Sequence, residues 1–166
     1  WVDLVMPTTD GDYIYESYAA AITPKTKIVY LTHLINWTGQ IIPVKVLKKI
    51  ADLAHKYGAE VIVDGAHTLA HTVYQIPELN CDYYGTSLHK WMCAPFGSGL
   101  LYIKKDKIKK VWALLSNDQP DGENIRKFES LGTRSFASEM AIGSAVDFHN
   151  AIGSERKEKR LFELKK

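Results

Sequence analysis

The sequence predicts an α/β protein built in layers around an at least partly parallel sheet, and three observations support this fold class. Strand-like and helix-like segments alternate along the chain, with no internal repeat and no low-complexity segment. The predicted strands are short and rich in β-branched and aromatic residues, whereas residues 43–57 carry a helical apolar stripe. Polar residues follow directly after several strands, where α/β sheets gather their functional groups.

The first half of the chain predicts two helices and two strands. They are a helix at residues 13–22, a buried strand at 27–34, a helix at 43–57 and a strand at 60–64. Pro24 breaks the first helix, Pro43 begins the second, and Gly58 ends it. The second strand has the carboxylate of Asp64 as its last residue.

The second half predicts two further strands and three helices. They are strands at 81–87 and 98–104, a basic helix at 105–115, a turn-rich segment at 116–134, a long helix at 136–152 and a charged helix at 154–166. The last segment has six basic and three acidic side chains, or +3, so the rest of the chain sums to −1. Because its opposite charges alternate, we expect a solvated helix.

Composition excludes several classes of function. The 166 residues, 46% of them apolar, can bury a sizeable core without structural metals or disulfides. With 21 basic and 19 acidic side chains there is no basic surface for a nucleic acid. No apolar stretch approaches the roughly 18 residues of a membrane helix. The two cysteines make no disulfide framework, which favours a reducing compartment such as the cytoplasm.

Lys90 is the first candidate catalytic residue. It stands in the apolar and aromatic segment 83–95. Burial disfavours the charged form of a lysine, and so does a nearby cation such as a protonated His89. A neutral lysine attacks an aldehyde and forms a Schiff base. The alternative is an ordinary surface lysine after a strand end.

Asp64 is the second candidate. The small residues Gly65 and Ala66 follow it and let a planar group approach the backbone. A carboxylate at this place can hold a proton on a ring nitrogen, which makes that ring a better electron sink. Equally open is that Asp64 caps the segment that follows.

His67 and His71 form a third candidate group. Their spacing of four places both on one face of a helix, and with Cys81 or Cys93 they would suggest a zinc site. No Cys-x-x-Cys or His-Glu-x-x-His pattern accompanies them, so the alternative is ordinary packed or surface histidines.

Asp64 and the group of Ser87, His89 and Lys90 lie 23 to 26 residues apart after successive strands. With them the sequence resembles the class V aminotransferases, which are pyridoxal-phosphate (PLP) enzymes of fold type I. Four ordered motifs carry the resemblance, in residues 32–39, 63–67, 82–91 and 132–134. It covers most of residues 20–153 and implies a three-layer α/β/α fold with a mostly parallel sheet, part of the large domain of such an enzyme.

The resemblance implies roles for the residues that match the cofactor ring's partners. Lys90 matches the lysine that holds PLP as an internal aldimine and moves protons at the α-carbon of an amino-acid substrate. Asp64 matches the partner of the ring nitrogen. His67 and Asn36 match residues near the ring and its phenolic oxygen.

The resemblance also implies contacts to the phosphate of PLP. Ser87 and His89 match residues beside the lysine, and a hydroxyl and an imidazole can both donate to a dianion. Thr133 matches a threonine that reaches the phosphate of the neighbouring subunit. A homodimer with two shared active sites is therefore implied.

The nearest branch of the family is the isopenicillin N epimerase-like one, on the evidence of His67 and residues 89–95. Cysteine desulfurases are the rival branch, but their sulfur-accepting cysteine follows the lysine at a distance, and no cysteine follows Cys93 here. We expect Cys93 to be a buried packing thiol. Arg126 and Arg134 are candidates for an anionic substrate, with a surface or interface role as the alternative.

The resemblance also predicts that this chain is part of a longer protein. Residues 1–153 would be a portion of the PLP-binding large domain, and residues 154–166 a charged helix leading towards a C-terminal small domain. Two further hypotheses stay open: a small metal-binding module, and a structural fragment that has an incomplete cofactor site.

Overall fold

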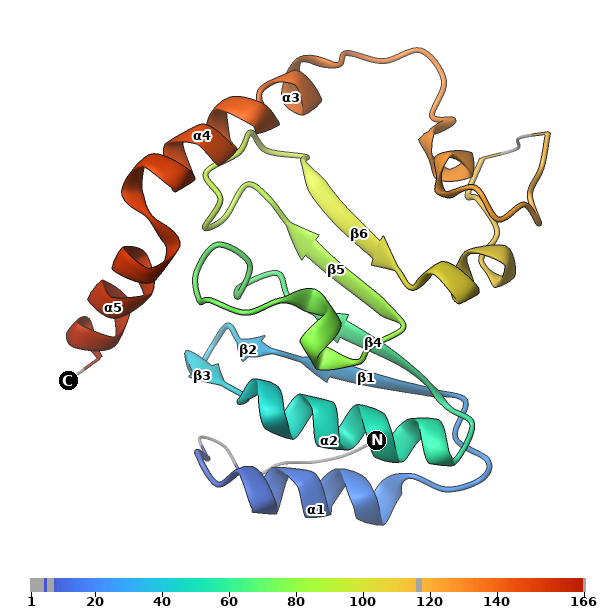
Figure 1. Cartoon of the computed structure of the whole chain (residues 1–166), viewed down its shortest axis with the longest axis vertical. Helices are drawn as coiled ribbons and strands as arrows, with labels where there is room; N and C mark the ends of the chain where they lie inside the picture. Colours follow the sequence, from blue (N-terminus) through green and yellow to red (C-terminus); the bar gives the residue numbers. More distant parts are fainter. Residues whose placement is uncertain (1–4, 6–7, 116–117, 166) are drawn as a thin grey trace.

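The computed structural model describes residues 5, 8–115 and 118–165, and its centre is a four-stranded sheet (Figure 1). The strands are β1 (Ile28–Thr32), β4 (Glu60–Asp64), β5 (Tyr83–Ser87) and β6 (Gly99–Ile103). Their order in the sheet is β1-β4-β5-β6, with β1, β4 and β5 parallel and β6 antiparallel to β5. The predicted α/β class with a mostly parallel sheet is confirmed.

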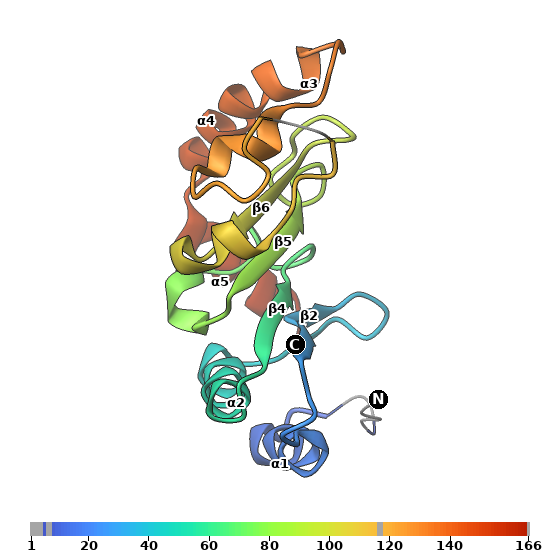
Figure 2. The same ribbon diagram turned by 90° about the vertical axis from the view of Figure 1, so that its right-hand side faces the viewer.

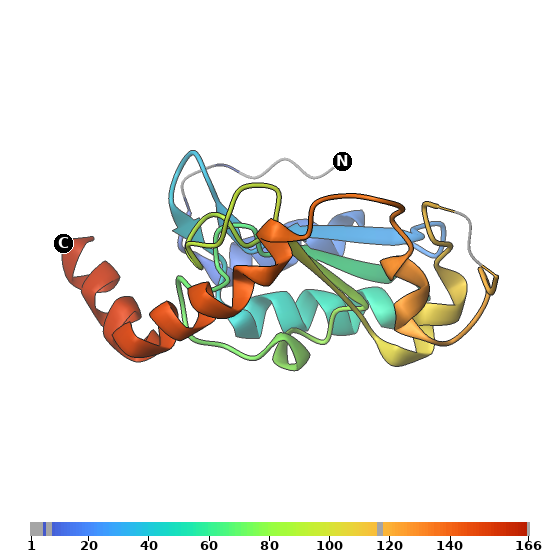
Figure 3. The ribbon, with the colours of Figure 1, turned by 90° about the horizontal axis from the view of Figure 1, so that it is seen from above.

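Helix α2 (Val44–Lys56) connects β1 to β4 and covers one face of the sheet (Figure 3). Its apolar stripe is fully or nearly fully buried and consists of Val46, Leu47, Ile50, Ala51 and Ala54. The stripe packs on alternate strand residues, among them Leu31, Val61, Val63 and Tyr84. Helix α1 (Gly11–Ala21) packs beside α2 and adds Ile14 to the same core.

The opposite face of the sheet is only partly covered by the described residues. Ile28 and Tyr30 are 58% and 54% exposed there, so the prediction of a fully buried first strand was wrong. The reason is the alternation of side chains along a strand, because α2 packs on one face only. The short helix η3 (Ile125–Glu129) and the residues after it border this face, where they help to enclose an open cavity of about 750 Å³.

A small hairpin follows β1. It consists of β2 (Leu34–Ile35) and β3 (Gln40–Ile41), and it projects to the side of the sheet away from α2 (Figure 2). The predicted buried strand at 27–34 is thus two strands, separated at His33. After β4, the 3₁₀ helix η1 (Ile76–Leu79) lies in the connection to β5.

The region after β6 differs from the sequence prediction. The basic segment forms only a 3₁₀ helix, η2 (Lys105–Lys110), in place of a helix to residue 115. Lys105, Lys109 and Lys110 are exposed, whereas Lys107 turns inward to pair with Glu60 and Asp82. Ile108 is the apolar residue that η2 buries. The predicted long helix is interrupted at Ala141, which separates α3 (Ala137–Met140) from α4 (Ile142–Ile152).

Helix α5 (Ser154–Leu164) follows α4 after Gly153, which has a φ of 90°. The predicted charged helix is present, and the two helices turn around the loops at one end of the sheet (Figure 1). In the part of the chain that the structure describes, no helix is long and apolar enough to span a bilayer.

Candidate functional site

The candidate residues gather at the carboxyl ends of β4 and β5. Asp64 is the last residue of β4 and pairs in register with Gly85, two residues before the end of β5 at Ser87. Two loops extend from these strand ends, and we name them after the residues they carry. The His67 loop is residues 65–75 and the Lys90 loop is residues 88–98.

Both carboxylate oxygens of Asp64 accept hydrogen bonds. Oδ1 accepts from the backbone N–H of Ala66 at 2.9 Å, and Oδ2 accepts from the hydroxyl of Tyr30 at 2.7 Å. Asp64 therefore does cap the turn after β4, as the alternative interpretation held. A carboxylate has about four acceptor positions, so these two donors leave room for a third.

Tyr30 lies on the neighbouring strand β1, on the open face of the sheet. Partial burial and then the hydrogen bond to Asp64 raise the pKa of Tyr30 to about 12. The phenol thus remains a donor to Asp64 throughout the neutral range. Sequence reasoning missed this residue, although the buried neighbours Val29 and Leu31 place Tyr30 on the other face.

Lys90 meets His67 across the two loops. The distance from Lys90 Nζ to His67 Nε2 is 2.9 Å, and both side chains are partly buried. Burial, followed by the charge of Lys90, lowers the pKa of His67. A neutral His67 can accept a hydrogen bond from the lysine, which fixes the position of the amine.

His71 and Trp91 make a second contact between the loops. Their rings stack with centroids 4.0 Å apart, and His71 Nδ1 hydrogen-bonds the carbonyl of His67 at 2.8 Å. His71 is thus engaged in packing and in holding its own loop. Among the described residues, no group of three or more His, Cys, Asp or Glu side chains is arranged to hold a metal ion.

Ser87 and His89 flank the strand end beside Lys90. Ser87 lines the open cavity together with Asp64 and Ala66. Among the residues that the structure describes, His89 Nδ1 is buried without a hydrogen-bond partner, and its ring centroid lies 5.3 Å from that of Phe96. A buried imidazole nitrogen without a partner is costly unless something else supplies the missing hydrogen bond, which is a feature typical of ligand sites.

A set of hydroxyl groups lies beneath the His67 loop. The carbonyl of Gly65 accepts from Thr68 Oγ1 at 3.3 Å and from Thr86 Oγ1 at 3.1 Å, and Tyr84 OH also reaches it, at 3.4 Å. Tyr74 OH contacts both Tyr84 OH and Thr68 Oγ1. The turn that follows Asp64 is therefore anchored in the core.

Asn36 and Thr133 are not linked to this group by the hydrogen bonds of the described residues. Asn36 is exposed in the turn between β2 and β3, and Thr133 is exposed in the segment before α3. Within the described residues, no hydrogen bond joins either of them to Lys90 or Asp64. Arg134, beside Thr133, forms an ion pair with Glu139 at 2.6 Å.

Cys93 differs from its prediction. It is exposed, not a buried packing thiol, and its φ is 60°. In this left-handed conformation the turn of the Lys90 loop directs the side chain outward, and the buried thiol is Cys81 instead.

Comparison with known proteins gives this geometry a family context. The profile of the family described as Aminotransferase class-V matches residues 2–166. The isopenicillin N epimerase of Amycolatopsis lactamdurans is 31% identical over 175 residues, which cover 96% of this chain and 43% of that protein. A probable cysteine desulfurase of Halalkalibacterium halodurans is 37% identical over 165 residues, covering 93% of this chain and 39% of that protein. The chain spans about two fifths of the length of these relatives.

Solved structures share the fold. The cystine C–S lyase C-DES, in complex with its product cysteine persulfide, aligns with a TM-score of 0.73 and 25% identity, over 88% of this chain and 42% of that one. The cysteine desulfurase CsdA from Escherichia coli aligns with a TM-score of 0.74 and 24% identity, over 86% of this chain and 37% of that one.

Proposed function

Because this chain belongs to the class V aminotransferase family, we propose that it carries the lysine and the ring-nitrogen partner of a PLP-dependent enzyme acting at the α-carbon of an amino acid. The observation that carries the proposal is the pairing of Lys90 with His67 at 2.9 Å beside Asp64, at one edge of the sheet. The protein's fold is the α/β fold of the fold type I enzymes.

The residues present fit the cofactor that this family implies, pyridoxal phosphate. Lys90 supplies an amine for its aldehyde, and Asp64 retains acceptor capacity for a protonated ring nitrogen. Ser87 supplies a hydroxyl, and the partnerless Nδ1 of His89 supplies a buried donor for phosphate. When bound, PLP supplies an electron sink for the charge that develops at the α-carbon.

The side chains then have separate tasks. Asp64 holds a proton on the ring nitrogen, and Tyr30 and the Ala66 N–H fix the orientation of its carboxylate. Lys90 is the nearest general base for the α-proton. His67, kept neutral by burial and by the charge of Lys90, accepts a hydrogen bond from the lysine and keeps its Nζ in place.

Reductive labelling tests this assignment. The protein is incubated with PLP, reduced with borohydride, digested and mapped by mass spectrometry. We expect the label on Lys90, with loss of labelling in Lys90→Met and unchanged labelling in the control Lys104→Met, which alters a lysine at the far end of β6. An absence of label, or label scattered over surface lysines, would contradict the proposal and favour a structural fragment with an incomplete site.

Within the family, we propose an isopenicillin N epimerase-like reaction, in which the α-proton is removed and returned. His67 beside Lys90 supports this branch. Cys93 follows Lys90 by only three residues, whereas the sulfur-accepting cysteine of the rival desulfurases follows the lysine at a distance. The test incubates the purified protein with amino acids in deuterated water. Exchange and inversion at the α-carbon are expected, whereas sulfide and alanine from cysteine would point to a desulfurase instead.

We further propose that two copies share their active sites. Thr133 is exposed and free of the Lys90 site in its own chain, so it is available to the phosphate site of a neighbouring copy. The test mixes inactive Lys90→Met subunits with Thr133→Val subunits. Partial recovery of activity in the mixture, together with a dimer by light scattering, is expected, and a monomer would contradict the proposal.

We propose the same domain organisation that the sequence indicates. Residues 1–153 form a portion of the large domain, and residues 154–166 lead towards a small domain. The free thiols of Cys81 and Cys93 favour a reducing compartment such as the cytoplasm.

A further inference from the structure

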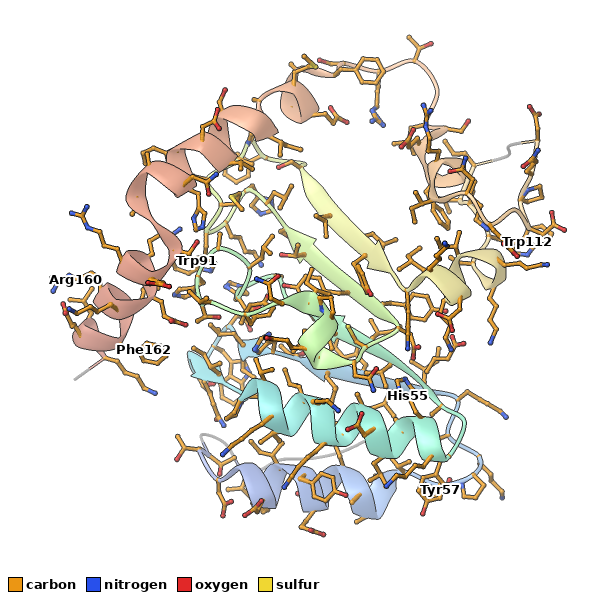
Figure 4. The ribbon with its side chains drawn as sticks, viewed as in Figure 1. His55, Tyr57, Trp91, Trp112, Arg160 and Phe162 are labelled. Carbon is orange, nitrogen blue, oxygen red and sulfur yellow. The ribbon has the colours of Figure 1, made fainter. Side chains whose placement is uncertain are left out.

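Two consecutive residues of α5 each bind the backbone of one site loop. Lys157 Nζ donates to the carbonyl of Trp91 at 2.6 Å, in the Lys90 loop. Glu158 Oε1 accepts from the backbone N–H of Val73 at 2.8 Å, in the His67 loop. Figure 4 shows Trp91 beside α5. These contacts join residues 66 and 85 positions apart in the chain.

Helix α4 contacts the same two loops through apolar packing. Ala145 forms a buried cluster with Leu88 and Ala94 of the Lys90 loop. Leu69 of the His67 loop, Met92 of the Lys90 loop and Ile142 of α4 pack against this cluster. This small cluster is separate from the main core between α2 and the sheet. The α4–α5 unit therefore contacts both loops with apolar side chains and with charged ones.

Lys157 is itself held in place. Its Nζ lies 3.5 Å from His149 Nδ1 on α4, and His149 Nε2 lies 2.9 Å from the hydroxyl of Ser154 at the start of α5. The His149 ring is only 8% exposed, whereas Ser154 and the bond from Lys157 to Trp91 lie at the surface. The charged donor makes the surface contact to the Trp91 carbonyl stronger than a neutral hydrogen bond at the same place.

Each of the two loops contains a non-glycine residue in the left-handed backbone conformation, which is energetically unfavourable. Ala70 in the His67 loop has a φ of 59° and Cys93 in the Lys90 loop has a φ of 60°. Residues other than glycine populate this left-handed region at a cost of about 1 kcal/mol or more, so the surroundings must hold them there. The two α5 contacts lie within three residues of these positions, at Val73 and Trp91.

We propose that Lys157 and Glu158 are positioning residues, which hold the His67 loop and the Lys90 loop at the separation that brings Lys90 Nζ onto His67 Nε2. Neither side chain touches Lys90 or His67, and each acts through the backbone of its loop. The inference rests on the proposed function of Lys90, because the positioned group is the lysine amine.

The test compares removal of each contact with removal of an equivalent exposed residue. The variants are Lys157→Met and Glu158→Met, and the matched controls are Lys159→Met and Glu155→Met at exposed positions of the same helix. Backbone hydrogen exchange is measured by mass spectrometry on the purified protein with and without PLP. We expect exchange to rise about tenfold in residues 88–98 for Lys157→Met and in 65–75 for Glu158→Met. The controls should leave both loops unchanged.

A second readout separates positioning from general stability. The rate of PLP labelling of Lys90 is followed against pH, and we expect its profile to shift in both contact variants and not in the controls. Lys157→Arg and Glu158→Gln keep a donor and an acceptor, so they should restore the profile. Unchanged exchange in both loops, or an equal rise over the whole chain, would overturn the positioning role. An unlabelled Lys90 in the unaltered protein would instead overturn the proposed function.

Discussion

Tyr30 and Tyr83 donate equivalent hydrogen bonds to carboxylates at opposite ends of β4. Tyr30 OH lies 2.7 Å from Asp64 Oδ2 at the carboxyl end, and Tyr83 OH lies 2.7 Å from Glu60 Oε2 at the amino end. The chemistry is the same, but only the first pair lies at the candidate site. This symmetry offers a matched comparison between a functional and a structural hydrogen bond.

We expect Tyr30→Phe to weaken PLP binding by about tenfold, because the Asp64 carboxylate loses a donor that fixes its orientation. Tyr83→Phe should lower the free energy of unfolding by about 1–2 kcal/mol and leave PLP affinity unchanged. Fluorescence titration with PLP and urea denaturation measure the two effects. Equal PLP affinity in the two variants would show that Tyr30 does not support Asp64.

Gly65 is required because the side chain of Tyr84 lies too close to its backbone for a Cβ atom. A Cβ at this position would overlap the hydroxyl and ring of Tyr84, which is fully buried and held by Tyr74. We expect Gly65→Ala to lower the free energy of unfolding by about 3 kcal/mol, because the core cannot make room. Gly85→Ala, where a Cβ meets nothing within 4 Å, is the control and should change stability by less than about 0.5 kcal/mol. Similar stabilities for both variants in urea denaturation would disprove the steric argument.

Lys127 organises the segment between β6 and α3. Only 7% exposed, its ammonium group donates to the carbonyls of Ile108, Pro120 and Gly122 at 2.7, 2.9 and 3.0 Å. One buried cation thus joins η2, η3 and the turn between them. The described part of this segment contains only the short helices η2 and η3. Lys127 therefore supplies hydrogen bonds to backbone carbonyls there.

Replacing Lys127 with methionine should lower the free energy of unfolding by about 3 kcal/mol. The methionine fills the space but leaves three carbonyls without their charged donor. Hydrogen exchange should rise in the described part of residues 105–129, with little change in β1 and β4. Lys109→Met alters an exposed lysine on η2 and is the control. A Lys127→Met protein as stable as this control would contradict the assignment.

The two ends of the sheet differ in how their charged and polar side chains are paired. At the amino ends of β4 and β5, Asp82 is buried and binds His55, Lys107 and the Val61 N–H. Glu60 joins the same group through Lys107, Lys110 and Tyr83. This network pairs its charges and stabilises the fold, although Asp82 Oδ1 is reached only by the ion pair to Lys107 within the described residues. At the candidate site, His89 Nδ1 is buried with no hydrogen-bond partner among those residues.

The stability of the fold should depend on pH through two groups, the buried His33 and the partly buried Glu60. Burial lowers the pKa of His33 from 6.5 to about 4, so the folded state resists a proton that the unfolded state takes up. Stability from His33 is complete above pH 6.5 and is lost as the pH falls towards 4, by up to about 3 kcal/mol.

Burial raises the pKa of Glu60, but hydrogen bonds from Tyr83, Lys107 and Lys110 outweigh it and lower the pKa to about 2. Its contribution is lost below about pH 4.5.

Urea denaturation between pH 7.5 and pH 3 checks both windows. We expect His33→Leu to flatten the fall in stability between pH 6.5 and 4, and Glu60→Gln to flatten only the fall below about pH 4.5. Should the slope between pH 6.5 and 4 be the same in His33→Leu as in the unaltered protein, His33 would not be the titrating group.

Much of the secondary structure can be predicted from local sequence patterns. The apolar stripe of α2, the five residues of β4 and the turn at Gly58 follow from periodicity and from residue type, and these elements lie within a residue or two of their predicted bounds. The order of strands places Asp64 and Lys90 near each other, because parallel strands end at the same edge of a sheet. Local pattern failed at residues 105–115 and at Ala141, where the helices end earlier than their residue types predict.

The contacts that make the site depend on the folded chain. Local sequence cannot place His67 Nε2 on Lys90 Nζ, Tyr30 on Asp64, or Lys157 and Glu158 on the two loops. These pairs are 23 to 85 residues apart, and their distances depend on loop backbones that packing holds in place. The spacing of apolar side chains determines which face of a helix or strand is buried. The distance between two loops depends instead on the tertiary contacts that hold both backbones in place.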